Sequence, residues 1–372
     1  MRIKIYVLPE YKESFWSVQS LKAVAAEILR KRYTAEYIEA ASVTEIDFDK
    51  VFAKGEKRVL LYIGFSIYRS PGDLRYLAEH GIHTLLLNYE SNNFTGSCSS
   101  ELLSYRDAIE KCVGYLTASG HDRIALVGVN PNSTVDMLKK DRFVEYLRMK
   151  GEEESHSVFY NSGSLEGCLK SFLRSQTNHN AVICVNDVSA LMLLRLLKEN
   201  GIRVPEDIYV ISCGFSTMLA EHAAPTLTTV AADQNAIGAQ AVQAYATLMK
   251  NFGDITLTVR VAPNLTVRGS TNFDSDPGTI IAPMSPSPAP LFDFYADPEA
   301  KSFFNAESLL LSSDELDRGI LAGVLAGETY ASIAERLYTS ENVISYRMKR
   351  MFKITGCEKK HELISLLTPY FN

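Results

Sequence analysis

The chain has 372 residues, of which 46% are hydrophobic and 22% charged, and a formal net charge of -6 at pH 7. This composition is typical of a folded globular protein, and it excludes a disordered, collagen-like or disulfide-stapled chain. The net charge excludes a protein that is basic along its whole length. It leaves room for a small basic module, because nucleic acid responds to the local field of a domain.

Six cysteines are scattered without a CxxC pair, which predicts reduced, mostly buried thiols in a cytosolic protein. No apolar run is long enough to cross a bilayer, and the first nine residues resemble a strand more than a signal peptide. We therefore expect a cytoplasmic protein with no membrane partner. GxSxG, HExxH, P-loop and zinc-ligand patterns are absent, so we predict no enzyme, no catalytic residues, no metal and no cofactor.

From residue 1 to 271, short apolar runs alternate with amphipathic stretches. Runs that are apolar on both faces are typical of parallel strands covered by helices on both sides. Helical spacing appears around residues 18–28 and again over 190–200, where Gly201 provides a stop signal. The pattern predicts a doubly wound α/β architecture. The strands are expected at 3–8, 59–63, 84–87, 124–129, 181–185 and 208–212.

The composition changes after Thr271, because six of the thirteen prolines fall within residues 272–300. Proline removes backbone donors and no periodicity survives here, so we predict a semi-extended linker over 272–306. Residues 307–372 show helical patterns and no strand signal. They are expected to form a small all-α domain.

Two helices joined by a short turn are predicted within that domain, with Thr329 capping the first and Ser340 the second. On the second helix an apolar stripe lies opposite basic residues, and residues 345–360 carry a local charge of +5. A basic face on the second helix of a helix-turn-helix is typical of a recognition helix. A charged stripe can also be merely a solvated surface. The single sign of the charge within an acidic chain and the length of the helix and turn favour DNA.

This segment resembles the LuxR-type helix-turn-helix over about 55 residues, chiefly through Ile-Ala-Glu-Arg-Leu at 333–337 and Ser-Glu-Asn at 340–342. It departs from the family by about two extra residues before Gly327 and one after Lys353. Arg347 and Tyr346 are expected at base edges, and the basic residues Lys349, Arg350 and Lys353 at phosphates. The full set of expected DNA contacts is Thr329, Ser332, Ser340, Asn342, Ser345, Tyr346, Arg347, Lys349, Arg350 and Lys353.

The first 271 residues resemble the effector-binding core of LacI/GalR-type regulators, which is itself similar to periplasmic sugar-binding proteins. The matching stretches are 122–128 with 139–143, 181–187 with 201–208, and 225–230 with 265–271. The resemblance implies a two-lobed, doubly wound periplasmic-binding-protein-like core with the effector, a sugar or related metabolite, in the cleft. By analogy the lobes are 1–117 with 233–261, and 118–232 with 262–271.

Ligands in such sheets bind at the carboxyl ends of strands and in the loops that follow. The candidate ligand-binding residues at these positions are Tyr11, Phe15, Trp16, Ser66, Ser70, Asn88, Asn130, Lys139, Asn186, Asp187 and Phe215. An aromatic in a first helical turn can equally be core, and Asp187 could simply cap a helix. The chain has Ser-Cys-Gly-Phe at 212–215 where many members carry an acid, and Lys139 where many carry arginine. These departures indicate either a more basic pocket that prefers a phosphorylated or acidic ligand, or a site that has degenerated.

The sequence therefore predicts a ligand-responsive transcription regulator that binds an inverted-repeat operator as a homodimer. The chain begins on the first strand, so we expect the C-terminal module to replace the family's N-terminal helix-turn-helix and hinge helix. The alternative is a ligand-binding signalling protein whose C-terminal helices contact a protein partner. That alternative predicts no salt-sensitive affinity for DNA.

Overall fold

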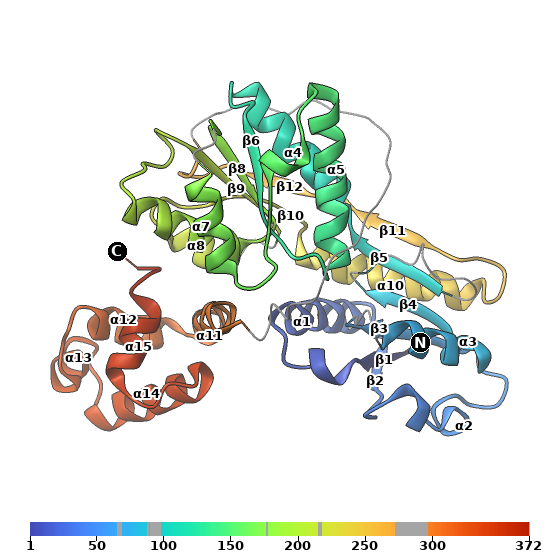
Figure 1. The fold of residues 1–372 in the computed structure, drawn as a ribbon. Helices are drawn as coiled ribbons and strands as arrows, with labels where there is room; N and C mark the ends of the chain where they lie inside the picture. Colours follow the sequence, from blue (N-terminus) through green and yellow to red (C-terminus); the bar gives the residue numbers. More distant parts are fainter. Residues whose placement is uncertain are drawn as a thin grey trace. The chain divides into compact units, whose positions relative to one another are not determined.

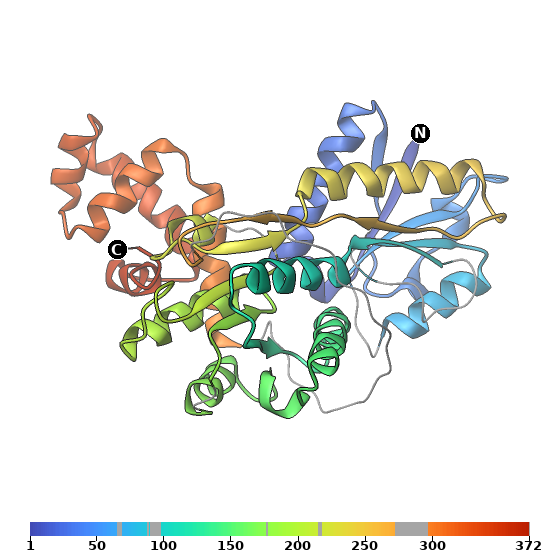
Figure 2. The same ribbon diagram turned by 90° about the horizontal axis from the view of Figure 1, so that it is seen from above.

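The chain folds into two compact units, residues 1–108 with 231–264 and residues 109–230 with 265–372, each built on a six-stranded sheet (Figure 1; Figure 2). The expected fold class, two doubly wound α/β lobes, is confirmed. The six cysteines carry free thiols and five of them are buried. The computed structural model describes residues 1–64, 69–87, 89, 98–175, 178–214, 218–271 and 297–371.

The first unit holds six parallel strands in the order β11-β5-β4-β3-β1-β2. The strands are β1 (Arg2–Val7), β2 (Thr34–Tyr37), β3 (Val59–Ile63), β4 (His83–Leu87), β5 (Cys98–Leu103) and β11 (Thr258–Val261). The helices are α1 (Phe15–Arg30), α2 (Phe48–Val51), α3 (Ser70–Glu79) and α10 (Gln234–Lys250), with 3-10 turns η1 (Pro9–Tyr11) and η2 (Val43–Glu45).

This sheet is covered on both faces. Successive side chains of a strand point to opposite sides, so β1 sends Ile3 and Ile5 into one core and Tyr6 into the other. Helices α1 and α10 close the first core, whereas η2, α2 and α3 close the second. Burial on both faces explains why these strands are apolar throughout.

Helices α1 and α10 approach closely at Gly238. A Cβ placed on Gly238 would lie 2.5 Å from the carbonyl carbon and oxygen of Ala23, which are backbone atoms of α1. We expect Gly238→Ala to destabilise the first unit by about 1–3 kcal/mol, because the helices must separate. Urea unfolding followed by fluorescence of the single tryptophan, Trp16, measures this. Gly72→Ala has open space at its Cβ and serves as the control; equal losses in both variants would contradict the expectation.

The second unit has a sheet in the order β12-β10-β9-β8-β6-β7, with parallel ladders from β10 through to β7. Its strands are β6 (Ile124–Val129), β7 (Val158–Tyr160), β8 (Ala181–Cys184), β9 (Tyr209–Cys213), β10 (Thr228–Ala231) and β12 (Asn264–Thr266). The helices of its α/β part are α5 (Thr134–Lys150), α6 (Glu154–Ser157), α7 (Leu165–Arg174), α8 (Asp187–Glu199) and α9 (Met218–His222), and α4 (Tyr105–Ala118) spans the boundary between the units.

Six strands match the predicted apolar runs to within one or two residues, and β3 and β6 match them at both ends. The other six strands were not predicted, because all but β5 have only three or four residues and several are polar: β2, Thr34–Tyr37, is largely exposed. Helix α8 begins at Asp187 rather than at residue 190, since Asn186 caps it.

Two predicted boundaries shift by several residues, and the other two breaks between the lobes shift by two or three residues. Residues 109–117 were expected in the first lobe, but they belong to the second unit, where the Tyr115 hydroxyl lies 2.8 Å from Thr271 Oγ1. The linker expected over 272–306 ends earlier, because Asp297 caps a helix that starts at Pro298. Its residues 272–296 lie outside the described part of the chain.

Five helices make up the C-terminal part: α11 (Pro298–Ser312), α12 (Glu315–Leu325), α13 (Tyr330–Arg336), α14 (Glu341–Thr355) and α15 (Lys360–Leu367). The two predicted caps are observed, Thr329 before α13 and Ser340 before α14. The apolar core of these helices is continuous with that of α8 and α9, so they pack directly on the second α/β part. In the part of the chain that is described, no helix combines the length and apolarity needed to cross a membrane.

Candidate functional site

Helix α14 has one polar, exposed face. The side chains of Asn342, Tyr346, Lys349 and Lys353 are exposed and recur every three or four residues, so they lie on one side of the helix. The opposite side buries Ile344, Met348 and Met351 in the core. A polar stripe that starts in the first turn of the second helix suits insertion into a major groove.

The turn before α14 presents further polar groups. Thr329 Oγ1 accepts the Ser332 N–H at 3.2 Å, and Ser340 Oγ accepts the Val343 N–H at 3.4 Å. Both hydroxyls therefore hold helix N-termini in place and remain exposed. Ser345 is half-buried, and Tyr338, which was not among the predicted contacts, is 98% exposed in the turn.

Arg347 and Arg350 point into their own domain rather than away from it. Arg347 Nη1 lies 2.6 Å from Asp314 Oδ2 and 3.2 Å from Asp317 Oδ1. Arg350 Nη2 lies 2.6 Å from Asp317 Oδ2 and donates to the Ser312 carbonyl at 2.8 Å. Asp317 is fully buried. The sequence assigned Arg347 to base edges, but in this structure Tyr346 and Lys349 occupy the exposed positions.

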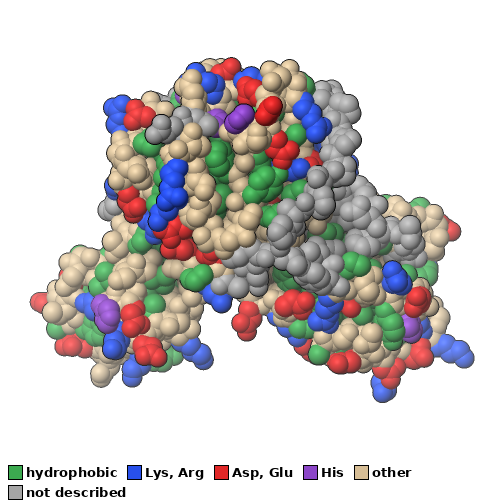
Figure 3. Space-filling model, in the orientation of Figure 1, with side chains coloured by type: hydrophobic (Ala, Val, Ile, Leu, Met, Phe, Trp, Pro, Cys, Tyr) green, Lys and Arg blue, Asp and Glu red, His purple; other side chains and the backbone are tan. Residues whose placement is uncertain are grey.

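The basic charge of residues 345–360 is thus partly compensated. Besides the two arginines, Lys360 donates to the Glu328 carbonyl at 2.6 Å and lies over the Tyr330 ring. The exposed positive charges that remain are Lys349, Lys353 and Lys359. Figure 3 shows acidic and basic side chains intermixed on the visible face of these helices.

A second polar cluster lies at the carboxyl ends of β6, β8 and β9, which are neighbours in one sheet. Asn130 follows β6 and Asn186 follows β8. The loops after β8 and β9 pass close together, because a Cβ on Gly214 would lie 3.1 Å from Asn186 Cα. The sheet order therefore brings together residues far apart in the sequence at the edge where ligands bind in such folds.

Lys139 reaches this edge from α5 but is paired. Its Nζ donates to the Val185 carbonyl at 2.7 Å and lies 3.7 Å from Asp136 Oδ1. Burial raises the pKa of Asp136, which also accepts the Asn130 N–H at 3.2 Å. With Asp187 the cluster holds two acids and one base, so Lys139 does not make this edge basic, contrary to the sequence-based expectation.

The two residues after β8 have different roles. Asn186 Oδ1 accepts the Ser189 N–H at 2.9 Å and caps α8. Asp187 is therefore not the cap that the sequence allowed; it is the first residue of the helix, and it accepts a hydrogen bond from the Ser212 hydroxyl of β9. It is 2% exposed, so a buried acid stands beside the carboxyl end of β9.

Asn161, directly after β7, was missed by sequence reasoning. Its side chain is fully buried, and neither Oδ1 nor Nδ2 finds a hydrogen-bond partner among the described residues. Its backbone N–H donates to the Val129 carbonyl, which places it beside the end of β6. Buried amides are almost always hydrogen-bonded, so this one is a candidate ligand contact. In the sequence, the only signal for Asn161 as a ligand contact is its position directly after a short strand.

The candidates of the first unit lie after β1 and β3. The Tyr11 and Trp16 rings are 6.1 Å apart, and Trp16 packs against the core of α1 and α10. Phe15 is buried, and Ser70 is buried 3.3 Å from the Tyr62 hydroxyl. These contacts give Trp16 and Ser70 structural roles. Three predicted ligand contacts lie outside the described residues: Ser66, Asn88 and Phe215.

Two contacts join α8 and α9 of the second unit to α11 of the C-terminal part. Glu307 of α11 accepts the N–H groups of Met218 and Leu219, at 2.7 and 3.0 Å, and so closes the first turn of α9. Burial raises the pKa of Glu307 to about 7, and the charge of Asp187 adds to this effect. Arg195 of α8 lies 3.7 Å from Glu299 of α11. The described residues hold no cluster of three metal-binding side chains.

The chain is similar in sequence to a known domain family and to several characterised proteins. Residues 113–271 match the periplasmic binding protein-like domain. The chain is 27% identical over 161 residues to the transcriptional repressor PurR of Pasteurella multocida (42% of this chain, 48% of that protein) and 30% identical over 179 residues to the regulator MalR of Streptomyces coelicolor (45% and 50%). The chain thus spans about half the length of the curated relatives it matches.

Solved structures extend the likeness to nearly three quarters of the chain. A complex of the transcriptional regulator CelR with cellobiose matches with a TM-score of 0.60 and 18% identity, covering 72% of this chain and 84% of that one. A LacI transcriptional regulator from a Rhodococcus species matches with a TM-score of 0.59 and 19% identity, covering 73% and 98%. At these identities the likeness establishes the fold: a periplasmic binding protein-like core shared with LacI-type regulators.

Proposed function

We propose that the protein is a ligand-responsive transcription regulator, with an effector-binding core over residues 1–271 and a DNA-binding helix-turn-helix formed by α13 and α14. The observation that carries the proposal is the exposed polar stripe on α14, formed by Asn342, Tyr346, Lys349 and Lys353. It lies on the second of two helices whose N-termini are capped by Thr329 and Ser340. The relatives, which are transcriptional repressors and regulators, support the same function for the core.

In this proposal α14 enters the major groove with its first turns. Asn342, Tyr346 and Lys349 meet base edges, and Lys353 neutralises a phosphate. The cap hydroxyls of Thr329 and Ser340, with Ser332 and Ser345, lie near the backbone of the DNA. Arg347 and Arg350 act indirectly, because their ion pairs with Asp317 hold α14 against α12.

The effector is proposed to be a neutral sugar or related metabolite with several hydroxyl groups. The polar edge of the second unit offers both acceptors and donors, from Asp187, Asn130 and the orphaned amide of Asn161. Because Lys139 is already paired with Asp136, the edge gives no excess positive charge that would select a phosphate. In the first unit, the Tyr11 ring, which lies 6.1 Å from the Trp16 ring, is the candidate for stacking on a ring.

The route from effector to DNA runs through α11. Helix α8 begins at the polar edge with Asp187, and α9 begins five residues after the end of β9. Both helices contact α11, through Arg195 with Glu299 and through the backbone of α9 with Glu307. A ligand that prefers one position of these helices will shift how the helix-turn-helix is presented. We further propose a cytoplasmic homodimer on an inverted repeat.

Selection from a random DNA pool with the full-length protein tests the function. An enriched inverted repeat, bound more weakly as salt increases, is the expected result. The absence of enrichment, with no salt-dependent DNA affinity at any effector condition, would reject the proposal and favour a protein partner for the C-terminal helices.

Variants of the α14 stripe separate base contacts from phosphate contacts. Lys349→Ala is expected to lower affinity for the selected site by about tenfold and to affect a scrambled site less. Lys353→Ala should weaken binding to both sequences alike and reduce the salt dependence by about one ion. Titrations at two salt concentrations measure both effects. Lys301→Ala, an exposed lysine on α11, is the control; if it behaves like Lys353→Ala, the stripe is not the DNA face.

A further inference from the structure

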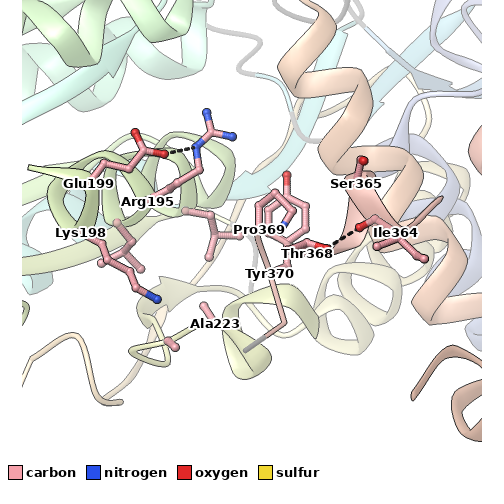
Figure 4. A pocket seen from close by; sticks show the side chains of 12 residues that line it. Arg195, Lys198, Glu199, Ala223, Ile364, Ser365, Thr368, Pro369 and Tyr370 are labelled. Carbon is pink, nitrogen blue, oxygen red and sulfur yellow. Dashed lines mark hydrogen bonds and ion pairs between the residues drawn. The ribbon is translucent and has the colours of Figure 1, made fainter. Parts of the chain in front are cut away.

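A cavity of about 540 Å³ lies in the second unit, where the C-terminal helices meet α8. Figure 4 shows residues of α8 on one side and the segment from Ile364 to Tyr370 on the other. Its volume is within the range of about 300–1,000 Å³ found for small-molecule pockets. It is separate from the polar edge, because none of the candidate effector residues lines it. The full lining is Leu191, Leu194, Arg195, Lys198, Glu199, Ala223, Ala224, Ile364, Ser365, Thr368, Pro369 and Tyr370.

The lining combines an apolar surface with the hydrogen-bond donors of Arg195 and Tyr370. Arg195 Nε is buried and finds no hydrogen-bond partner among the described residues. The two carboxylates nearest to its guanidinium, Glu199 and Glu299, lie at 3.8 and 3.7 Å, beyond hydrogen-bond distance. A guanidinium carries five N–H donors and no acceptor. Its unmet requirement is therefore for acceptor oxygens.

Tyr370 supplies a second donor. Its ring packs edge-on against Phe303 with the centroids 6.2 Å apart. Burial raises the pKa of Tyr370 to about 12, so the hydroxyl stays protonated near neutral pH and can donate. Thr368, in contrast, already donates its hydroxyl hydrogen to the Ile364 carbonyl at 2.7 Å.

We propose that this cavity binds a small organic anion, an oxyanion joined to an apolar body. Arg195 and the Tyr370 hydroxyl would donate to the oxyanion, and Leu191, Leu194 and Pro369 would cover the apolar body. The buried Nε–H of Arg195, which has no hydrogen-bond partner among the described residues, and the Tyr370 hydroxyl favour an anion, since charge-assisted hydrogen bonds satisfy such donors best. Because the ligand touches both α8 and the segment after α15, its occupancy strengthens the contact between the α/β part and the helix-turn-helix. The site is thus a second ligand input, distinct from the sugar site.

Ligand-observed NMR titration of the full-length protein with four simple probes tests this site. Benzoate and phenyl phosphate carry both features and distinguish a carboxylate from a phosphate. Benzyl alcohol keeps the ring without the charge, and inorganic phosphate keeps the charge without the ring. We expect saturable binding of at least one of the first two probes, and binding of the other two weaker by about tenfold or more.

Variants locate the binding. Arg195→Gln should weaken binding of the preferred anion by about tenfold, and Tyr370→Phe, which removes only the hydroxyl, by about threefold or more. Arg203→Gln is the matched control, because Arg203 pairs with Asp207 outside the cavity and should leave binding unchanged. The Tyr370→Phe result decides the matter should Arg195→Gln fail to fold. Failure of both anions to bind, or undiminished binding to Tyr370→Phe and Arg195→Gln, would overturn the proposal.

Discussion

Replacing Asp317 with alanine is expected to destabilise the C-terminal helices by about 3–5 kcal/mol. Asp317 is fully buried, its carboxylate binds both Arg347 and Arg350, and Oδ2 also accepts the Asp314 N–H at 3.2 Å. Removing one partner of a buried ion pair leaves charge without compensation, which costs far more than the pair itself contributes. Arg347 would keep only Asp314 and Arg350 only the Ser312 carbonyl, and the start of α12 would lose its reciprocal cap.

Hydrogen exchange of the α12 and α14 peptides in the full-length chain, measured at increasing urea, gives this free energy without interference from the other unit. Glu315→Gln is the matched control, since it removes one negative charge from the same helical turn at an exposed position. Arg347→Ala should cause a smaller loss, because Arg350 still pairs with Asp317. A change below about 1 kcal/mol for Asp317→Ala would show that the ion pairs do not hold α14 in place.

The second large effect concerns the pH dependence of the contact between α9 and α11. Burial raises the pKa of Glu307 from 4.5 to about 7, although the N–H groups of Met218 and Leu219 favour its charged form. Because the folded pKa is the higher one, the folded chain retains a proton that the unfolded chain loses. Stability is therefore greatest below about pH 4.5 and falls as pH rises to about 7. The upward shift of the Glu307 pKa corresponds to about 3 kcal/mol of folding stability, which is lost as the pH rises between these two values.

Glu307→Gln removes this titration and keeps the shape of the side chain. We expect the local stability of α9 and α11, measured by hydrogen exchange corrected for intrinsic rates, to fall between pH 5 and pH 7.5 in the natural protein. In Glu307→Gln it should change much less over the same range. Glu299→Gln, on the same helix but away from α9, should behave like the natural protein. Identical pH profiles for all three proteins would contradict the prediction.

The carboxylates of Asp317 and Glu307 are both buried or largely buried, and both lie outside the two helices proposed to contact DNA. Asp317 orients the helix that we propose for DNA, and Glu307 holds α11 against α9 of the α/β part. Both lie on α11 or α12, outside the two helices that sequence patterns single out as the helix-turn-helix. A search for function restricted to α13 and α14 would therefore overlook the residues expected to have the largest effects on it.

Local patterns predicted the two helices of this module well. Thr329 and Ser340 cap helices that begin at Tyr330 and Glu341, because a cap requires only one hydroxyl and the next few backbone N–H groups. The same reasoning failed for Arg347. Its partners Asp314 and Asp317 lie about thirty residues away, and no local pattern shows that a basic side chain on a polar face will turn toward a buried acid.

At the candidate ligand-binding edge, too, some features were predictable from local sequence and others depended on tertiary contacts. The sequence predicted that strands end before Asn130 and Asn186, since short apolar runs followed by polar residues are a local signal. The pairing of Lys139 with Asp136 and of Asp187 with Ser212 depended on the order of the strands. Asn161 became a candidate only because its whole surroundings are known, as burial without a partner is a property of the folded chain.

The sequence by itself thus determined the α/β class, the main buried strands and the boundaries of the helix-turn-helix, because each depends on periodicity or capping within a few residues. Only the tertiary structure decided which charges remain exposed on α14, where the C-terminal helices pack and how a cavity forms against α8. These features depend on contacts between segments that are distant in the chain: about thirty residues for Arg347 with Asp317, and nearly ninety for Glu307 with Met218 and Leu219. The two sides of the cavity, α8 and the segment after α15, are well over a hundred residues apart. Burial and ion pairing over such separations follow from the packing of whole elements rather than from local sequence.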